Sequence, residues 1–353
     1  MTRVPFQLSL VLFIAAVTVS AGPNDWGRRA NSICLEQTPK LMRIHHVPGA
    51  SIALVENQRI VWADAFGVAN AESKAAVTTN TLFEAASMSK PLFAYAVLKL
   101  VEAEKLNLDR PLSEYLIKPY LADEPRHRQI TARMVLNHTS GFPNWRKGGW
   151  RSGNPLSLKF EPGAGFGYSG EGFLYLQRVA EHLTGEPLDR LMRQRLLRPL
   201  GMSTSSYKWE SANSTRIAAG HHQNGSLKTA VRRYDHPNAA YTLFTTPSEY
   251  ARFLIEMMKP DRSADHSLSA EMLSAMIQPD THDQTRQRHF GLGWSVLKRP
   301  HGNLVAHGGA NGSGFRCFSR FDPKRRTGIV IMTNGIGGAS LHQDLLKLID
   351  ATD

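Results

Sequence analysis

Apolar residues along the chain mark β-strands near both ends and helices in between. Residues 51–55 and 59–65 are β-rich runs separated by three polar residues, a pattern that predicts a hairpin. Towards the C-terminus, further runs predict strands joined by tight turns, at 292–297, 303–306, 314–321 and 328–333. Because short connections favour antiparallel pairing, the two ends of the chain together predict one antiparallel sheet.

Apolar residues at helical spacing predict four helices outside these strands, over about 24–44, 87–106, 171–184 and 339–349. Another helix start is marked by Thr246, Pro247 and Glu249, which form an N-cap, a first-turn proline and a capping box. The predicted fold class is α/β (mixed α+β), with an antiparallel β-sheet flanked by N- and C-terminal helices and an inserted helical subdomain. We expect the sheet part at about 24–106 and 286–353, and the helical subdomain at about 107–285.

Residues 1–21 have the features of a secretory signal peptide. One arginine precedes an apolar run over residues 8–19, and the small residues at 19–21 offer a cleavage site. The run is short for a membrane span, so an uncleaved anchor is the less favoured alternative. We therefore expect a secreted or periplasmic protein with a mature domain over 22–353 and no stable membrane insertion after cleavage.

Composition describes an ordinary globular chain that carries excess positive charge. Of its 353 residues, 42% are hydrophobic and 20% are charged, and the formal net charge is +12. The basic residues are scattered, without the aromatic and basic stripe of a nucleic-acid site, so we expect no nucleic-acid partner. Loose attraction to an anionic envelope surface is a consistent consequence of the charge.

The chain has two cysteines, Cys34 and Cys317. Export would permit a disulfide between them, and the alternative is two buried free thiols. The sequence leaves both open, because it does not show how closely the two residues approach.

Candidate chemistry begins with Ser87 and Lys90, three residues apart at the start of a predicted helix. That spacing puts a hydroxyl and an amine on one helix face, and Pro91 fits the first turn. A serine hydroxyl is a useful nucleophile when an adjacent base takes its proton. The pair is common at helix starts, however, and alone it indicates little.

Two later segments, together with Ser87 and Lys90, form a three-part motif pattern. Tyr168-Ser169-Gly170 precedes a helix in the middle region, and His307-Gly308-Gly309-Ala310 lies at the end of a late strand. This order matches the Ser-x-x-Lys motif, middle motif and late Lys-Thr-Gly motif of β-lactamases and penicillin-binding proteins. The chain resembles that serine β-lactamase and penicillin-binding-protein superfamily, specifically its class C β-lactamase, D-alanyl-D-alanine carboxypeptidase and esterase branch.

The resemblance implies a β-lactamase/transpeptidase-like fold, a small-molecule or peptide acyl substrate, and chemistry that needs no cofactor and no metal. It implies that Ser87 is the acylated nucleophile, that Lys90 is its hydrogen-bonded partner, and that Tyr168 is the general base. Whether Lys90 or Tyr168 holds the proton in the resting enzyme is left open. The implied oxyanion hole consists of the backbone N–H groups of Ser87 and Ala310, and the implied substrate-binding residues are Gly170, His307, Gly308 and Gly309.

Two positions depart from the family pattern. Gly170 stands where class C β-lactamases usually have an asparagine that contacts the substrate amide, which favours an esterase or a broad acyl hydrolase. His307 stands where many members have lysine; it either binds a substrate carboxylate when protonated or lines the cleft as a neutral residue. A class C-like β-lactamase, a D-alanyl-D-alanine carboxypeptidase and a non-catalytic penicillin-binding receptor are the alternatives. We assign His138 and Ser140 to a structural turn before Gly141.

Overall fold

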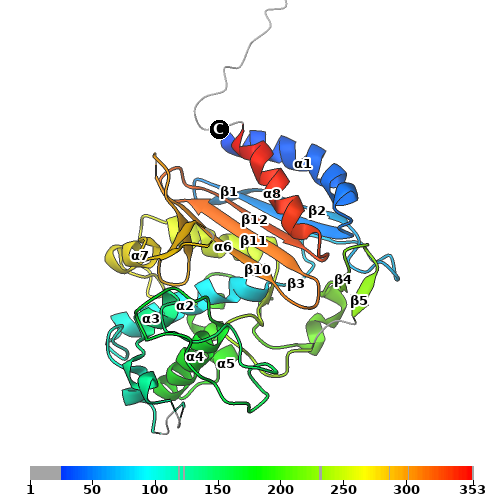
Figure 1. Cartoon of the computed structure of the whole chain (residues 1–353). Coiled ribbons are helices and arrows are strands. Elements are labelled where there is room, and N and C mark those ends of the chain that lie inside the picture. The colour runs from blue at the N-terminus through cyan, green and yellow to red at the C-terminus, as the bar shows by residue number, and fades with distance from the viewer. Residues whose placement is uncertain are drawn as a thin grey trace, which may run out of the picture.

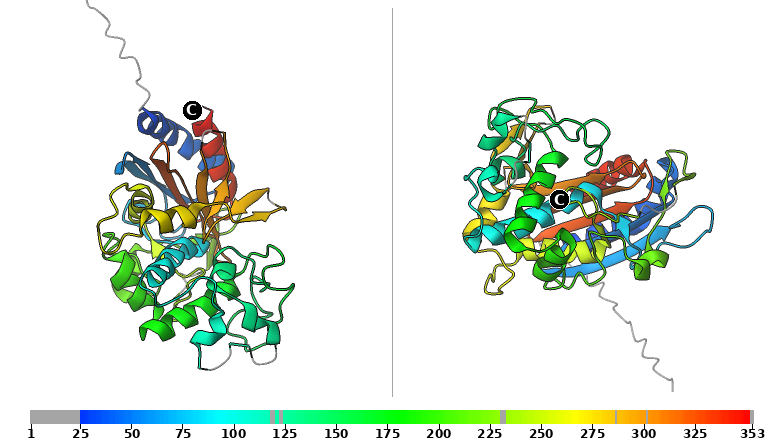
Figure 2. Two further views of the ribbon diagram at one scale, coloured as in Figure 1. Left: turned by 90° about the vertical axis from the view of Figure 1, so that its left-hand side faces the viewer. Right: turned by 90° about the horizontal axis from the view of Figure 1, so that it is seen from below.

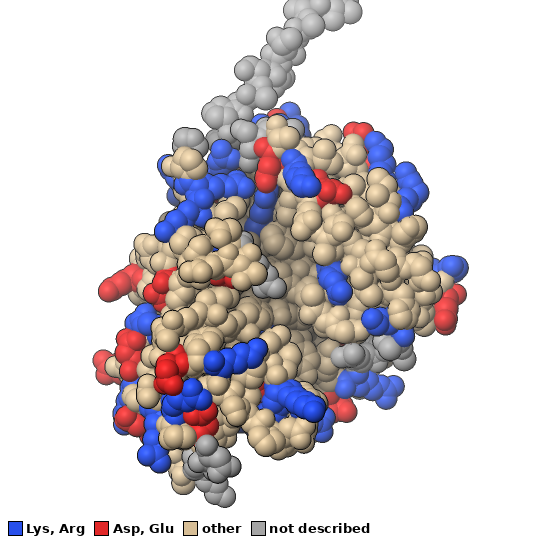
Figure 3. Space-filling model, viewed as in Figure 1, with Lys and Arg blue, Asp and Glu red and all other residues tan. Residues whose placement is uncertain are grey.

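The computed structural model describes residues 25–117, 120–121, 124–229, 233–285, 287–300 and 302–351. The predicted signal peptide lies outside these residues. Among the described helices, none combines the length and the apolar character that a membrane span requires. Lysine and arginine are spread over the face drawn in Figure 3, with acidic residues among them.

A large antiparallel sheet crosses the upper part of the molecule (Figure 1). Within the described residues it has eight strands in the order β2-β1-β12-β11-β10-β9-β8-β7. The strands are β1 (Gly49–Glu56), β2 (Arg59–Gly67), β7 (Thr281–Asp283), β8 (Arg288–Phe290), β9 (Ser295–Leu297), β10 (Leu304–Ala310), β11 (Arg316–Asp322) and β12 (Thr327–Thr333). Strand β1 pairs with β12, so segments from the two ends of the chain lie side by side and the predicted mixed fold is confirmed.

Helices α1 (Trp26–Ile44) and α8 (Gly338–Asp350) cover one face of this sheet (Figure 1). They pack on alternate strand residues, among them Ile52 and Leu54 of β1 and Ile331 of β12. The intervening residue Ala53 faces the main core on the opposite side. Since both faces of β1 are buried, its sequence is almost continuously apolar rather than alternating.

The other helices lie on the opposite side of the sheet (Figure 2). They are α2 (Ser89–Glu102), α3 (Ala132–Leu136), α4 (Gly170–Thr184), α5 (Leu188–Met192), α6 (Pro247–Met258) and α7 (Ala270–Ile277). Two short strand pairs are separate from the large sheet: β3 (Phe83–Glu84) with β6 (Phe244–Thr245), and β4 (Gly220–His221) with β5 (Leu227–Thr229). Helix α6 packs directly on β1, β2 and β12, so this part of the inserted region forms one core with the sheet.

The sheet extends further into the middle of the sequence than expected, because β7 begins at Thr281. The strand expected over 292–297 is shorter, since Gly293 adopts a left-handed φ of 89° and β9 begins at Ser295. Both cysteines are free and buried: Cys34 belongs to the core under α1 and Cys317 to the main core. The structure therefore shows two buried free thiols rather than a disulfide.

Candidate active site

Ser87 lies in a 3-10 turn, Ala86–Met88, directly before α2. The α-helix itself begins two residues later than the sequence suggested, at Ser89. The Ser89 hydroxyl holds the turn because it donates to the carbonyl of Ala86 at 2.6 Å and accepts from the N–H of Leu243 at 3.0 Å. Ala86 has a positive φ of 49°, a strained conformation for alanine that is typical of residues fixed at functional sites.

Lys90 is brought into direct contact with Ser87. Its side chain is almost fully buried, and Nζ donates to Ser87 Oγ at 3.2 Å and to the carbonyl oxygen of Ala240 at 2.9 Å. Nζ also lies 4.8 Å from the ring centre of Tyr168 and 5.6 Å from that of Phe173. Two oxygen acceptors and two aromatic faces thus surround the buried amine. Its distance to Ser87 Oγ lies at the limit of the hydrogen-bond reach that activation by an adjacent base requires.

Tyr168 precedes α4 and is positioned by the cap of that helix. Ser169 Oγ accepts from the N–H of Gly172 at 2.9 Å and donates to the carbonyl of Pro143 at 2.8 Å. The ring of Tyr168 packs on the imidazole of His138, with centroids 4.3 Å apart, while the N–H of Ser169 donates to His138 Nδ1 at 3.3 Å. Ring packing and helix capping together fix the direction of the tyrosine.

His138 lies in the turn that the sequence predicted, with a positive φ of 64°. It is fully buried, and burial together with the nearby charge of Lys90 lowers its pKa well below the usual range, so the ring is neutral. The contact with Tyr168 is a finding of the structure. The residues around His138 in the sequence predicted a turn but did not indicate a contact with Tyr168.

Strand β10 brings Ala310 to the nucleophile turn. A Cβ on Gly309 would lie 2.1 Å from the carbonyl oxygen of Ala85, so only glycine allows the strand to approach the turn this closely. Gly309 thus faces Ala85 and Ala86, which differs from its expected contact with substrate. Gly308 is exposed, and no atom lies closer than 3.8 Å to a Cβ placed on it.

His307 is buried on the same face of β10 as Gly309, opposite to Gly308. Its Nδ1 lies 2.8 Å from the carbonyl oxygen of Gly308, and its ring centre lies 6.3 Å from that of Tyr168. Burial, with the neighbouring charge of Lys90, lowers its pKa to about 3. The imidazole is therefore neutral near pH 7 in the free protein, which favours the alternative of a neutral residue over a cationic contact with a substrate carboxylate.

A cavity of about 470 Å³ opens beside the nucleophile. It is lined by Ser87, Lys90, Asn144, Trp145, Gly149, Trp150, Tyr241, Ala310, Asn311 and Gly312. The predicted oxyanion pair, Ser87 and Ala310, is thus brought to one cavity. Gly170 is buried behind the indole of Trp145, so Trp145 and not Gly170 lines the cavity at this position.

Several of these residues were missed by the sequence analysis. Trp145 and Trp150 were the one available signal that residues 144–160 contribute to the site. No sequence signal pointed to Glu84. It is buried in β3, where its Oε2 accepts a hydrogen bond from Ser313 Oγ at 2.7 Å and another from the side chain of Asn311. The carboxylate ties the turn after Ala310 to the strand that precedes Ser87.

The large sheet and the helices around it carry four features in the order expected for a β-lactamase-like protein. These are the serine and lysine at the helix start, the tyrosine of the middle loop and the late strand. The sequence model of the family described as Beta-lactamase matches residues 37–353. The chain belongs to this family.

Individual relatives are distant. Protein flp of Staphylococcus aureus is 24% identical over 313 residues, which cover 82% of this chain and 60% of that protein, so the chain spans about three fifths of that relative. Penicillin-binding protein 4 of Amycolatopsis lactamdurans is 27% identical over 337 residues, 88% of this chain and 87% of the relative. The crystal structure of D-alanine carboxypeptidase AmpC from Burkholderia cenocepacia shares the fold, with a TM-score of 0.77 at 20% identity over 93% of this chain and all of that one.

Proposed function

We propose that the protein hydrolyses carboxylic esters through an acyl-enzyme on Ser87. The contact between Lys90 Nζ and Ser87 Oγ at 3.2 Å, inside a cavity that Ala310 also lines, is the observation that carries the hydrolase proposal. The ester preference rests on Gly170: the family's amide-binding side chain is absent, and Trp145 fills its space.

Each step uses residues already in place. Ser87 Oγ attacks the ester carbonyl carbon and its proton moves to the basic group formed by Lys90 and Tyr168. The backbone N–H groups of Ser87 and Ala310 stabilise the resulting oxyanion, a contribution that is typically about 3 kcal/mol per donor. The C–O bond to the alcohol breaks as that proton passes to the leaving oxygen. Water then attacks the acyl-enzyme, releasing the acid and restoring Ser87.

Amide substrates form the second candidate. The names of two of the relatives, a penicillin-binding protein and a D-alanine carboxypeptidase, favour a β-lactam or a D-amino-acid peptide. A non-catalytic penicillin receptor is disfavoured by the intact Ser87 and Lys90 contact. We further propose export to the periplasm or medium, on the basis of the apolar run at residues 8–19.

The test compares substrates on one protein preparation. Purified mature protein is incubated with p-nitrophenyl esters, a fluorophosphonate probe and a fluorescent penicillin, alongside Ser87→Ala and Tyr168→Phe. We expect ester turnover and probe labelling in the wild type. Ser87→Ala should abolish both, and Tyr168→Phe should lower kcat by about 10²- to 10⁴-fold, the range for loss of a general base.

The outcomes separate the candidates. Rapid penicillin hydrolysis without ester turnover would overturn the ester preference and favour the β-lactamase alternative. Absence of both turnover and labelling in folded wild-type protein would overturn the proposal that the protein is an enzyme. Equal activity of Ser87→Ala and wild type would remove Ser87 from the mechanism.

A further inference from the structure

The cavity beside Ser87 has an aromatic wall drawn from two segments that are far apart in the sequence. Trp145 and Trp150 come from the loop before α4, and Tyr241 follows the residue whose carbonyl holds Lys90. The rings of Trp145 and Tyr241 meet edge to face, with centroids 5.5 Å apart at 82°. Trp150 Nε1 donates to the Tyr241 hydroxyl at 2.8 Å. The three rings thus form one connected surface.

Trp145 occupies the space that Gly170 leaves. A Cβ on Gly170 would lie 2.4 Å from Cζ2 and 2.5 Å from Cη2 of the indole. The φ of Gly170 is not in the left-handed region, so space rather than backbone conformation requires glycine at this position. Gly170 and Trp145 are therefore a matched pair, because the absence of a side chain at residue 170 leaves the room that the indole occupies.

The loop that carries Trp145 is held firmly. The guanidinium of Arg146 binds the buried carboxylate of Glu171 through two parallel hydrogen bonds of 3.0 and 2.9 Å, and the Glu171 side chain has no exposed surface. The carbonyl of Asn144 accepts from the N–H groups of Gly170 and Glu171, both at 3.0 Å. A wall fixed before substrate arrives loses little conformational freedom on binding.

We propose that Trp145, Trp150 and Tyr241 bind the acyl group of the substrate and select esters of apolar carboxylic acids, aryl or medium-chain alkyl. This proposal rests on the ester hydrolase function above and names its substrate class. Among the described residues that line the cavity, Lys90 has the one basic side chain, and its two hydrogen bonds go to Ser87 and Ala240 rather than to the aromatic wall. A charged acyl group placed against the three rings would lose its hydration there without gaining a charged partner from the wall.

The test is a series of p-nitrophenyl esters with a constant leaving group and a changing acyl group: acetate, butyrate, octanoate and phenylacetate. In the wild type we expect kcat/KM to rise by roughly threefold to fourfold for each methylene buried between acetate and butyrate. The ratio of kcat/KM for phenylacetate to that for acetate should exceed about tenfold, and Trp145→Ala or Trp150→Ala should lower it towards one. Trp62→Ala, a half-buried tryptophan on β2 outside the cavity, is the matched control and should keep the ratio.

A double-mutant cycle distinguishes the wall from a general loss of packing. Gly170→Ala should lower the ratio by displacing the indole, and it should have no further effect when Trp145 is already alanine. Circular dichroism and melting curves establish that each variant is folded. If Trp145→Ala does not fold, Trp150→Ala, on the exposed loop, replaces it in the comparison of acyl groups. A flat wild-type profile, or equal effects of Gly170→Ala in both backgrounds, would overturn the inference. Failure of the wild type to hydrolyse any of the esters would instead overturn the proposed function.

Discussion

Two neighbouring glycines on β10, Gly308 and Gly309, have different surroundings. Gly309 faces the nucleophile turn, where a Cβ would come within 2.1 Å of the Ala85 carbonyl oxygen. Gly308 faces outward, and the nearest atom to a Cβ there is the carbonyl oxygen of Cys317 at 3.8 Å. Successive residues on a strand point to opposite faces, so the same substitution at adjacent positions should have opposite consequences.

Gly309→Ala should separate β10 from the turn that carries Ser87. Because the clash is with backbone, we expect a loss of about 1–3 kcal/mol in the free energy of unfolding. Displacement of Ala310 from Ser87 should lower kcat by at least about 10²-fold, the effect of losing one oxyanion donor. Urea unfolding and ester kinetics measure the two effects.

Gly308→Ala is the control at the open position. Its free energy of unfolding should stay within about 0.5 kcal/mol of the wild type. If the two alanine variants were equally stable and equally active, the close approach of β10 to Ala85 would not matter to the fold or the site.

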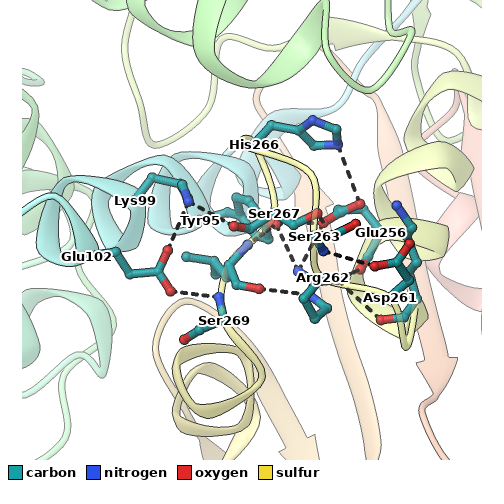
Figure 4. A network of polar contacts seen from close by, with 12 residues as sticks. Tyr95, Lys99, Glu102, Glu256, Asp261, Arg262, Ser263, His266, Ser267 and Ser269 are labelled. Carbon is teal, nitrogen blue, oxygen red and sulfur yellow. Dashed lines mark hydrogen bonds and ion pairs between the residues drawn. The ribbon is translucent and has the colours of Figure 1, made fainter.

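At the scale of elements, a buried polar network fixes α2 to the chain around α6 and α7 (Figure 4). The hydroxyl of Tyr95 on α2 donates to Glu256 Oε1 on α6 at 2.8 Å and accepts from Arg262 at 3.0 Å. Arg262 also pairs with Glu256 at 2.9 Å, and the two side chains are only 9% and 4% exposed. Since α2 carries Lys90 at its start, this network stabilises the element that presents the candidate nucleophile.

Arg262→Met should leave the Glu256 carboxylate buried without its cation. We expect a loss of about 3–5 kcal/mol in the free energy of unfolding, the usual cost of breaking one partner out of a buried ion pair. Arg178→Met is the matched control, because its pair with Glu181 is 3.4 Å long and the arginine is 53% exposed. The control should lose less than about 1 kcal/mol. Similar melting temperatures for the two variants would contradict a structural role for the network.

Some strands and contacts could be predicted from the sequence, and others could not. The hairpin of β1 and β2 and the final strands were predicted, because long apolar runs and turn residues mark them. Strands β7 and β8 were not, since three-residue strands show no period. The contact of Trp145 with Gly170 and the burial of His307 depend on tertiary packing, which local sequence patterns do not predict. The roles of Ser87, Lys90 and Tyr168 stay predictions that the geometry supports.

At the scale of the whole molecule, folding keeps several histidines neutral. His138, His307 and His342 are buried, and burial is the largest cause of a lowered pKa in each; for His307 and His342 the value falls from 6.5 to about 3. Above pH 6.5 these rings are neutral in both the folded and the unfolded chain, so they do not affect stability. Between pH 6.5 and about 3 the unfolded chain takes up protons that the folded chain does not.

Stability should therefore fall as the pH is lowered below 6.5, by up to about 1.4 kcal/mol per pH unit for each such histidine. His342→Gln tests this away from the active site, because His342 lies on α8 and packs near Phe318. Urea unfolding at several pH values between 6.5 and 5, above the range in which most carboxylates titrate, should show a smaller slope for His342→Gln than for the wild type. His236→Gln, which removes an exposed histidine, should keep the wild-type slope. Parallel slopes for wild type and His342→Gln would mean that His342 is not held neutral by the fold, and acid sensitivity would then have to come from the carboxylates.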